Sequence, residues 1–170
     1  QRQMCIRDSN TCYMFNHRPN SLNAGSLWGR PFYILREAWN ILNAIAEGKI
    51  ESGDEKKLNA LKGETMAVIA LCQFDLTRCF GYPYTKDKGA SLGAPLIDHL
   101  VGTYENPPRS TVAQAYDFII ETLEEAVTLM SEEKNNGRMN KYAARALLAR
   151  IYLYHDDNRK AFDLADQLIK

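Results

Sequence analysis

The sequence predicts an all-α fold of about five helices that pack as hairpins and are interrupted by one long irregular loop. Apolar residues recur at steps of three and four over most of the chain, which is the pattern of amphipathic helices. Glycine and proline concentrate in short stretches between these periodic segments. With 170 residues, of which 45% are hydrophobic, the chain can form one domain with a sizeable core.

The first nine residues are expected to be foreign to this fold. The string from Gln3 to Asp8 resembles the translation of a transposase adapter used to prepare sequencing libraries. We therefore treat residues 1–9 as a non-native adapter scar. Residues 10–170 are expected to be a partial, C-terminally truncated helical domain, because the last helical pattern runs to the end of the chain without a glycine or proline stop signal.

The first helix is predicted to follow a loop. Residues 10–27 are rich in asparagine, serine, glycine and proline and show no periodicity, so a loop is expected there. Beginning near Trp28 or Pro31, apolar residues recur on one helical face. They are Phe32, Leu35, Trp39, Leu42 and Ala46. Gly48 is the expected stop, because glycine readily adopts the left-handed conformation that ends many helices.

The second helix is predicted to be the central one. Asp54 supplies N-cap chemistry, and the helical pattern then runs to Phe80, just before Gly81 and Pro83. Apolar residues occupy more than one face of this helix, so we expect it to be enclosed on most sides. Residues 86–108 follow as a glycine- and proline-rich irregular excursion, and long ordered loops of this kind often carry function.

Three further helices are predicted after the excursion. Ser110 or Thr111 caps the third, and residues 135–137 end it. The fourth runs from Asn140 through Tyr154, and the fifth begins after a polar turn at residues 156–158. The last two have the spacing of a tetratricopeptide-like helix pair, in which small alanines let the helices approach closely. The two N-terminal helices would make a second, more diverged pair.

The charge and hydropathy of the sequence argue against nucleic-acid binding and against a membrane-spanning helix. Lysine plus arginine total 21 and aspartate plus glutamate also total 21, so no net field attracts nucleic acid, and none is expected as a partner. The chain lacks the run of about 18 apolar residues that a membrane-spanning helix needs.

The cysteines do not suggest a disulfide or a metal site. Cys72 and Cys79 lie seven residues apart on one predicted helix, a rise of about 10 Å that a disulfide cannot bridge. No CxxC or Cys/His ligand spacing occurs, so no metal is expected. Both residues are expected to be buried free thiols.

Nothing in the sequence predicts catalysis. Glu121, Glu124 and Glu125 are close together but occupy a polar stripe of the third helix, which predicts a solvated face rather than an acid–base pair. The three histidines lie far apart and near no nucleophile motif. We therefore expect a protein that is not an enzyme, with no catalytic residue and no cofactor.

Several segments, in the same order, resemble the SusD/RagB family. Residues 61–84, LKGETMAVIALCQFDLTRCFGYPY, are similar to the family pattern lkaEAlalRAlayfdLvrlfGdvPy, although Ile69 replaces the family arginine. Tyr33, Trp39 and Asn43 match the preceding helix motif. Residues 93–96 resemble the family's giPl segment, residues 109–120 its next helix, and residues 137–157 its alanine-rich helix pair. The resemblance covers about residues 32–169.

This resemblance implies a function at a cell surface. SusD-like proteins are non-catalytic lipoproteins on the external face of the outer membrane of Bacteroidota-like bacteria, where they bind oligosaccharides for a SusC-like TonB-dependent transporter. The chain is therefore expected to take part in nutrient uptake and polysaccharide utilization, held to the membrane only by a lipid anchor that this sequence does not contain. The alternative is a tetratricopeptide-like adaptor that binds a protein or peptide along a concave helical surface.

Four residues are candidates for glycan contact. Trp28 and Tyr13 lie in or beside the expected N-terminal loop, where flat aromatic faces could stack on sugar rings. Asn23 could hydrogen-bond sugar hydroxyls in the same loop, and Tyr84 follows the end of the central helix. The alternative for the aromatic residues is local packing against the neighbouring helices.

Overall fold

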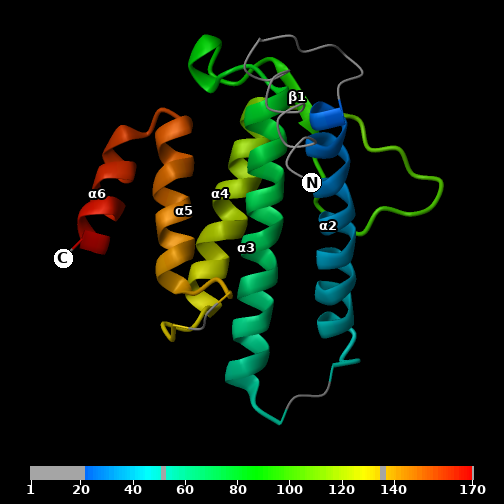
Figure 1. Ribbon diagram of the computed structural model, residues 1–170, viewed down its shortest axis with the longest axis vertical. Coiled ribbons are helices and arrows are strands. Elements are labelled where there is room, and N and C mark those ends of the chain that lie inside the picture. The colour runs from blue at the N-terminus through cyan, green and yellow to red at the C-terminus, as the bar shows by residue number, and fades with distance from the viewer. Residues whose placement is uncertain (1–21, 51–52, 135–136, 170) are drawn as a thin grey trace, which may run out of the picture. The chain divides into compact units, whose positions relative to one another are not determined.

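The computed structural model describes residues 22–50, 53–134 and 137–169. In these ranges the α-helices are α2 (Leu22–Ala46), α3 (Glu55–Phe80), α4 (Val112–Leu129), α5 (Lys141–Tyr154) and α6 (Asn158–Ile169) (Figure 1). A 3-10 turn, η1 (Tyr84–Lys86), and two short strands, β1 (Leu92–Pro95) and β2 (Arg109–Thr111), lie between α3 and α4. The chain divides into two compact units, residues 1–30 and 31–170, so the boundary falls within α2. The predicted all-α class, with about five helices, is confirmed.

Helix α2 begins earlier than expected. The predicted loop is wrong for residues 22–27, which are helical, while residues 10–21 lie outside the described ranges. Glycine weakens a helix by only about 1 kcal/mol relative to alanine, so Gly25 and Gly29 are compatible with it. Pro31 lies inside α2 rather than at its start, at the cost of one backbone hydrogen bond.

Several other helix ends follow the local signals in the sequence, but the predicted end of the third helix at residues 135–137 is wrong, because α4 ends at Leu129. Gly48 has a φ of +67°, and the Lys49 N–H donates to the Ala44 carbonyl at 2.9 Å, which closes α2 as a Schellman motif. The Asp54 carboxylate caps α3 by accepting from the Lys56 N–H at 3.0 Å. Thr111 caps α4 and forms a capping box with Gln114. These predicted boundaries are confirmed.

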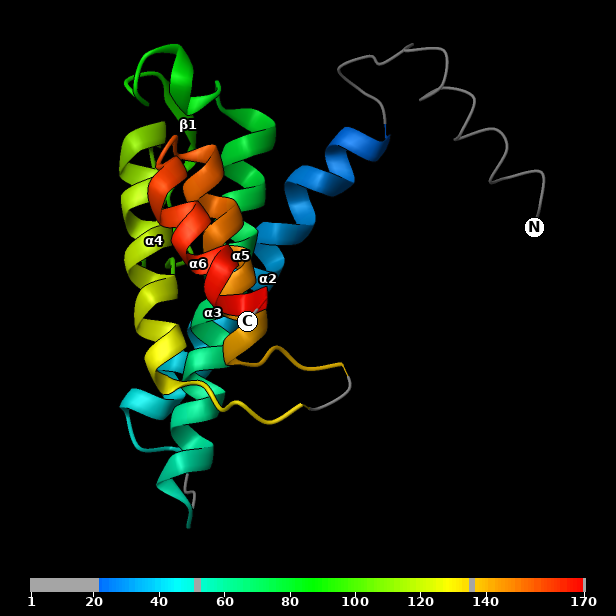
Figure 2. The same ribbon diagram turned by 90° about the vertical axis from the view of Figure 1, so that its left-hand side faces the viewer.

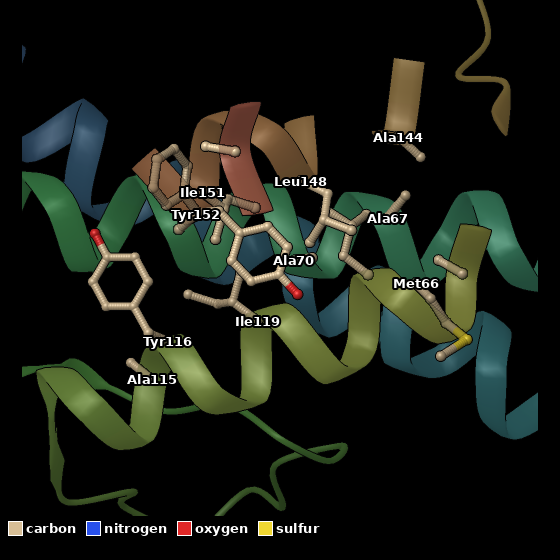
Figure 3. Close-up of a cluster of buried hydrophobic side chains, with 14 of the residues drawn as sticks. Met66, Ala67, Ala70, Ala115, Tyr116, Ile119, Ala144, Leu148, Ile151 and Tyr152 are labelled. Carbon is tan, nitrogen blue, oxygen red and sulfur yellow. The ribbon is translucent and has the colours of Figure 1, made fainter. Parts of the chain in front are cut away.

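The larger hydrophobic core lies among α3, α4, α5 and α6 (Figure 3). Small residues bring α3 and α4 together, because a Cβ added at Gly63 would lie 2.8 Å from Met130 Cγ. Helices α5 and α6 pack against each other, with Ala161 of α6 buried in this core, so the predicted C-terminal helix pair is confirmed (Figure 2). Burying one large apolar side chain contributes about 1.5–3 kcal/mol, which makes this core the main stabilising feature.

A smaller core lies on another side of α3. It joins Leu35 and Ala38 of α2 to Ile69 and Leu76 of α3, and it includes Ile97 from the excursion. Helix α3 is therefore packed against α2 as well as α4, which confirms its central position. The two N-terminal helices were predicted to form a separate pair. Helix α3 does pack against α2, but it also packs against α4.

The excursion is not wholly irregular, contrary to the prediction. Strands β1 and β2 pair antiparallel, with Leu92 opposite Thr111 and Pro95 opposite Arg109, and the register shifts between these two pairs. Strands this short have no alternating pattern from which they could be predicted, and β1 also contains glycine and proline. Their partners are also distant in sequence, so no local signal announces the pairing.

The two cysteines of α3 are both free but differ in environment. Cys72 is buried, and burial raises the pKa of its thiol to about 11, so it stays protonated. Cys79 is exposed, which makes the prediction of a second buried thiol wrong. It lies in the last turn of α3 beside exposed Arg78, beyond the part of the helix that is packed on most sides.

Within the residues that the structure describes, none of the helices combines the length and apolarity that a bilayer-spanning segment needs.

Candidate functional site

The excursion is held at its base by side chains from two helices. Gln73 of α3 is fully buried, and its amide Nε2 donates to the Pro95 carbonyl at 3.0 Å while its Oε1 accepts from the Ile97 N–H at 3.4 Å. From α2, the Trp39 indole Nε1 donates to the Ile97 carbonyl at 3.2 Å. A buried amide is unfavourable unless it is hydrogen-bonded, so these partners account for a polar residue at the centre of α3.

The returning strand is also anchored by side chains. Arg109 Nε donates to the Gly93 carbonyl at 2.7 Å, and its Nη2 donates to the Leu92 carbonyl at 3.0 Å. Ser110 Oγ donates to the Ala94 carbonyl at 3.1 Å. Residues 98–108, which we call the Tyr104 loop, therefore leave and rejoin the protein at fixed points. In Figure 1 this loop is the yellow-green segment to the right of α2.

A histidine placed between two carboxylates closes the Tyr104 loop. His99 Nδ1 lies 2.6 Å from Asp98 Oδ1, and His99 Nε2 lies 2.7 Å from Glu105 Oε1. The second oxygen of Glu105 accepts from the Gly102 N–H at 3.1 Å. The hydrogen bond with Asp98 is the largest cause that raises the pKa of His99 above its ordinary value of 6.5, and the hydrogen bond with Glu105 is the next. The hydrogen bond from the Gly102 N–H is the largest cause that lowers the pKa of Glu105, and the hydrogen bond with His99 is the next. The two pKa shifts therefore favour a charged pair of His99 and Glu105.

Tyr104 projects from this closed loop with 96% of its surface exposed. The side chains of Thr103, Glu105 and Asn106 beside it are exposed too. A flat aromatic face surrounded by polar groups can stack on an apolar face of a ligand while its neighbours hydrogen-bond the ligand. The sequence pointed to the excursion as functional but did not single out this residue. The available signal was a lone tyrosine between Gly102 and the two prolines.

The structure places two of the four predicted contact residues. Trp28 lies within α2 rather than in a loop, and its side chain is 39% exposed. Tyr84 is half-buried in η1, with its ring centroid 4.2 Å from that of His155 and 5.8 Å from that of Tyr116.

The other two residues cannot be placed. Tyr13 and the side chain of Asn23 lie outside the described part of the chain. Trp28 and Tyr84 belong to different compact units, so the four residues are not brought into one described site.

The acidic stripe of α4 faces solvent, as predicted. Glu121, Glu124 and Glu125 are exposed. Glu124 accepts a hydrogen bond from the Tyr152 hydroxyl at 2.6 Å, and Glu125 lies 3.2 Å from Lys62 Nζ. Among the described residues, no group of three or more His, Cys, Asp or Glu side chains could hold a metal ion.

Comparison with known proteins assigns the fold to a family. A family model of SusD-like proteins, described as starch-binding and associating with the outer membrane, matches residues 2–153. A SusD superfamily protein from Bacteroides vulgatus ATCC 8482 is 99% identical, with a TM-score of 0.90. The match covers 95% of this chain and 36% of that protein.

Two further solved structures are similar to this chain. A SusD superfamily protein from Bacteroides thetaiotaomicron VPI-5482 is 40% identical over 84% of this chain and 31% of its own, with a TM-score of 0.81. A laminarin-binding SusD-like protein, 22% identical over 84% of this chain and 29% of its own, shares the fold with a TM-score of 0.71.

The chain spans about a third of the length of these proteins. Comparison with curated proteins finds no match. The helical hairpins, the order of the sequence motifs and the match over residues 2–153 together show that the chain belongs to the SusD-like family.

Proposed function

We propose that this chain is the N-terminal part of a non-catalytic, glycan-binding outer-membrane protein. The observation that carries the proposal is the family match over residues 2–153, since that family is described as starch-binding and associating with the outer membrane. The full-length protein, with the remaining two thirds found in its relatives, would be lipid-anchored on the external face. It would deliver oligosaccharides to a SusC-like TonB-dependent transporter.

The candidate glycan contacts remain the four residues chosen from the sequence. Trp28 is the strongest of them, because part of its indole is exposed on α2. In the N-terminal segment, Tyr13 would stack on a sugar ring and Asn23 would hydrogen-bond sugar hydroxyls. Tyr84 would contribute an edge of its ring, since its packing against His155 and Tyr116 occupies much of the side chain.

Calorimetry on the full-length protein tests this function. The glycan panel contains neutral glucans, amylopectin and laminarin, and the anionic polymer polygalacturonate. We expect saturable binding to at least one glycan, and Trp28→Ala should weaken it by about tenfold, equivalent to about 1.4 kcal/mol. Tyr142→Ala, which removes an exposed tyrosine of α5, is the matched control and should leave affinity unchanged.

The second candidate function is the peptide-binding adaptor. It is favoured by one observation, a groove of 280 Å³ between α2 and α3 whose lining includes Ile34, Ile41, Leu61 and Val68. None of the described residues that line this groove has an aromatic side chain, whereas sugar stacking needs one. Absence of binding to every glycan, together with binding of a peptide that is lost in Ile34→Asp, would favour the adaptor.

A further inference from the structure

The Tyr104 loop carries negative charge and an exposed aromatic ring on a braced backbone. Its sequence, DHLVGTYENPP, contains two carboxylates, Asp98 and Glu105, and one histidine, but no lysine or arginine. Even with His99 protonated, the loop keeps a net negative charge. We propose that Tyr104 is a stacking residue for a neutral glycan, an inference that rests on the proposed function and names its ligand class.

The first argument is preorganisation. The loop is held at its base by Gln73 and Trp39, and near its tip by the contacts of His99 and Gly102 with Glu105. A contact residue on such a loop binds at little conformational cost, because the backbone is already ordered. The nearly complete exposure of Tyr104 therefore leaves both ring faces open to a ligand without any opening step.

The second argument is charge. A polyanionic glycan would bring its carboxylates or sulfates towards Asp98 and Glu105, and like charges repel. The hydroxyls of a neutral sugar can instead donate hydrogen bonds to these carboxylates, and bonds to an ionised acceptor are the stronger kind. The absence of lysine and arginine from residues 98–108 removes the cations that would recognise an anionic polymer.

The third argument separates a glycan from a protein surface. The centre of a protein interface is apolar and well packed around its aromatic anchors. The immediate neighbours of Tyr104 are Thr103, Glu105 and Asn106, which are exposed and polar. Polar groups beside a single aromatic face match the alternation of apolar faces and hydroxyls on a sugar ring.

The experiment compares Tyr104→Ala and Tyr104→Phe in the full-length protein, using the same calorimetry. Tyr104→Ala should weaken binding of amylopectin or laminarin by at least about tenfold, whereas Tyr104→Phe, which keeps the ring face, should stay within about twofold of the parent. Tyr142→Ala again serves as the control, and unchanged melting temperatures would show that the variants fold. Polygalacturonate should not bind.

Each other outcome counts against a specific statement. If the parent protein binds a neutral glucan and Tyr104→Ala binds it equally well, the stacking role is wrong while the proposed function stands. Tight binding of polygalacturonate would overturn the neutral ligand class. If Tyr104→Ala keeps glycan affinity but fails to capture the transporter, the loop is a protein contact. If the parent binds no glycan, the proposed function fails and this inference fails with it.

Discussion

The pair of helices α3 and α4 and the excursion that connects them are stabilised by different interactions. The two helices are held together mainly by buried apolar side chains such as Phe74 and Ile119, and Gly63 allows the helices to approach closely. In the excursion, a few polar side chains bind backbone groups, above all Gln73 and Arg109. The helices therefore depend on total buried area, whereas the excursion, apart from buried Ala94 and Ile97, depends on single contacts with defined geometry.

This difference matters for function. Apolar burial is non-directional and tolerates substitutions that preserve volume. Hydrogen bonds from a buried amide or a guanidinium place backbone atoms at defined positions, which a loop that presents a binding residue requires. The core supplies stability, and the polar anchors supply the position of Tyr104.

The largest effect is expected in the helical core. Phe74 is fully buried and meets Tyr116 and Tyr154 edge-on, at centroid distances of 6.3 and 5.3 Å. Phe74→Ala should lower the free energy of unfolding of the full-length protein by about 3–5 kcal/mol, measured by urea denaturation. Tyr104→Ala removes an aromatic side chain from the exposed loop and should change stability by no more than about 0.5 kcal/mol. Similar losses of unfolding free energy in Phe74→Ala and Tyr104→Ala would contradict the distinction between the helical core and the excursion.

An intermediate effect is expected at the base of the excursion. Gln73→Met keeps the volume but leaves the Pro95 carbonyl and the Ile97 N–H without these partners, which should cost about 1–3 kcal/mol. Hydrogen exchange at the Ile97 amide should become faster, while exchange within α4 should change less. Gln167→Met, at an exposed position of α6, is the control. A neutral result would mean that apolar packing of Ala94 and Ile97 holds the excursion.

The smallest effect is expected at the His99 contact. The raised pKa of His99 means that its contribution is fully present below pH 6.5 and is lost as pH rises through the folded-state pKa. The lowered pKa of Glu105 means that its contribution is present above pH 4.5 and is lost as pH falls through its folded-state pKa. The contact between His99 and Glu105 should thus be strongest between pH 4.5 and pH 6.5, where both side chains are charged.

Titration of His99 by NMR in the full-length protein checks this contact. Glu105→Gln should move the pKa of His99 down towards 6.5, because one of the two carboxylates is removed. Glu121→Gln, which alters an exposed carboxylate on α4, should leave that pKa unchanged. A His99 pKa unaffected by Glu105→Gln would show that the two side chains do not interact in solution.

Much of the helical architecture could be predicted because its signals are local. The ends at Gly48, Asp54 and Thr111 depend on residues within one helical turn, and the central position of α3 follows from apolar residues on several of its faces. The early start of α2 was missed because asparagine and glycine favour loops only weakly, so composition alone misled the prediction for residues 22–27.

The sequence by itself determined the helices, their caps, the absence of a bridge between Cys72 and Cys79, and the family. Only the tertiary structure decided that β1 pairs with β2, that Gln73 and Trp39 meet at Ile97, and that Tyr104 stands exposed. The physical reason is the range of the interactions. Helix signals act within about four residues, whereas these contacts join segments that are far apart along the chain and adjacent only after folding.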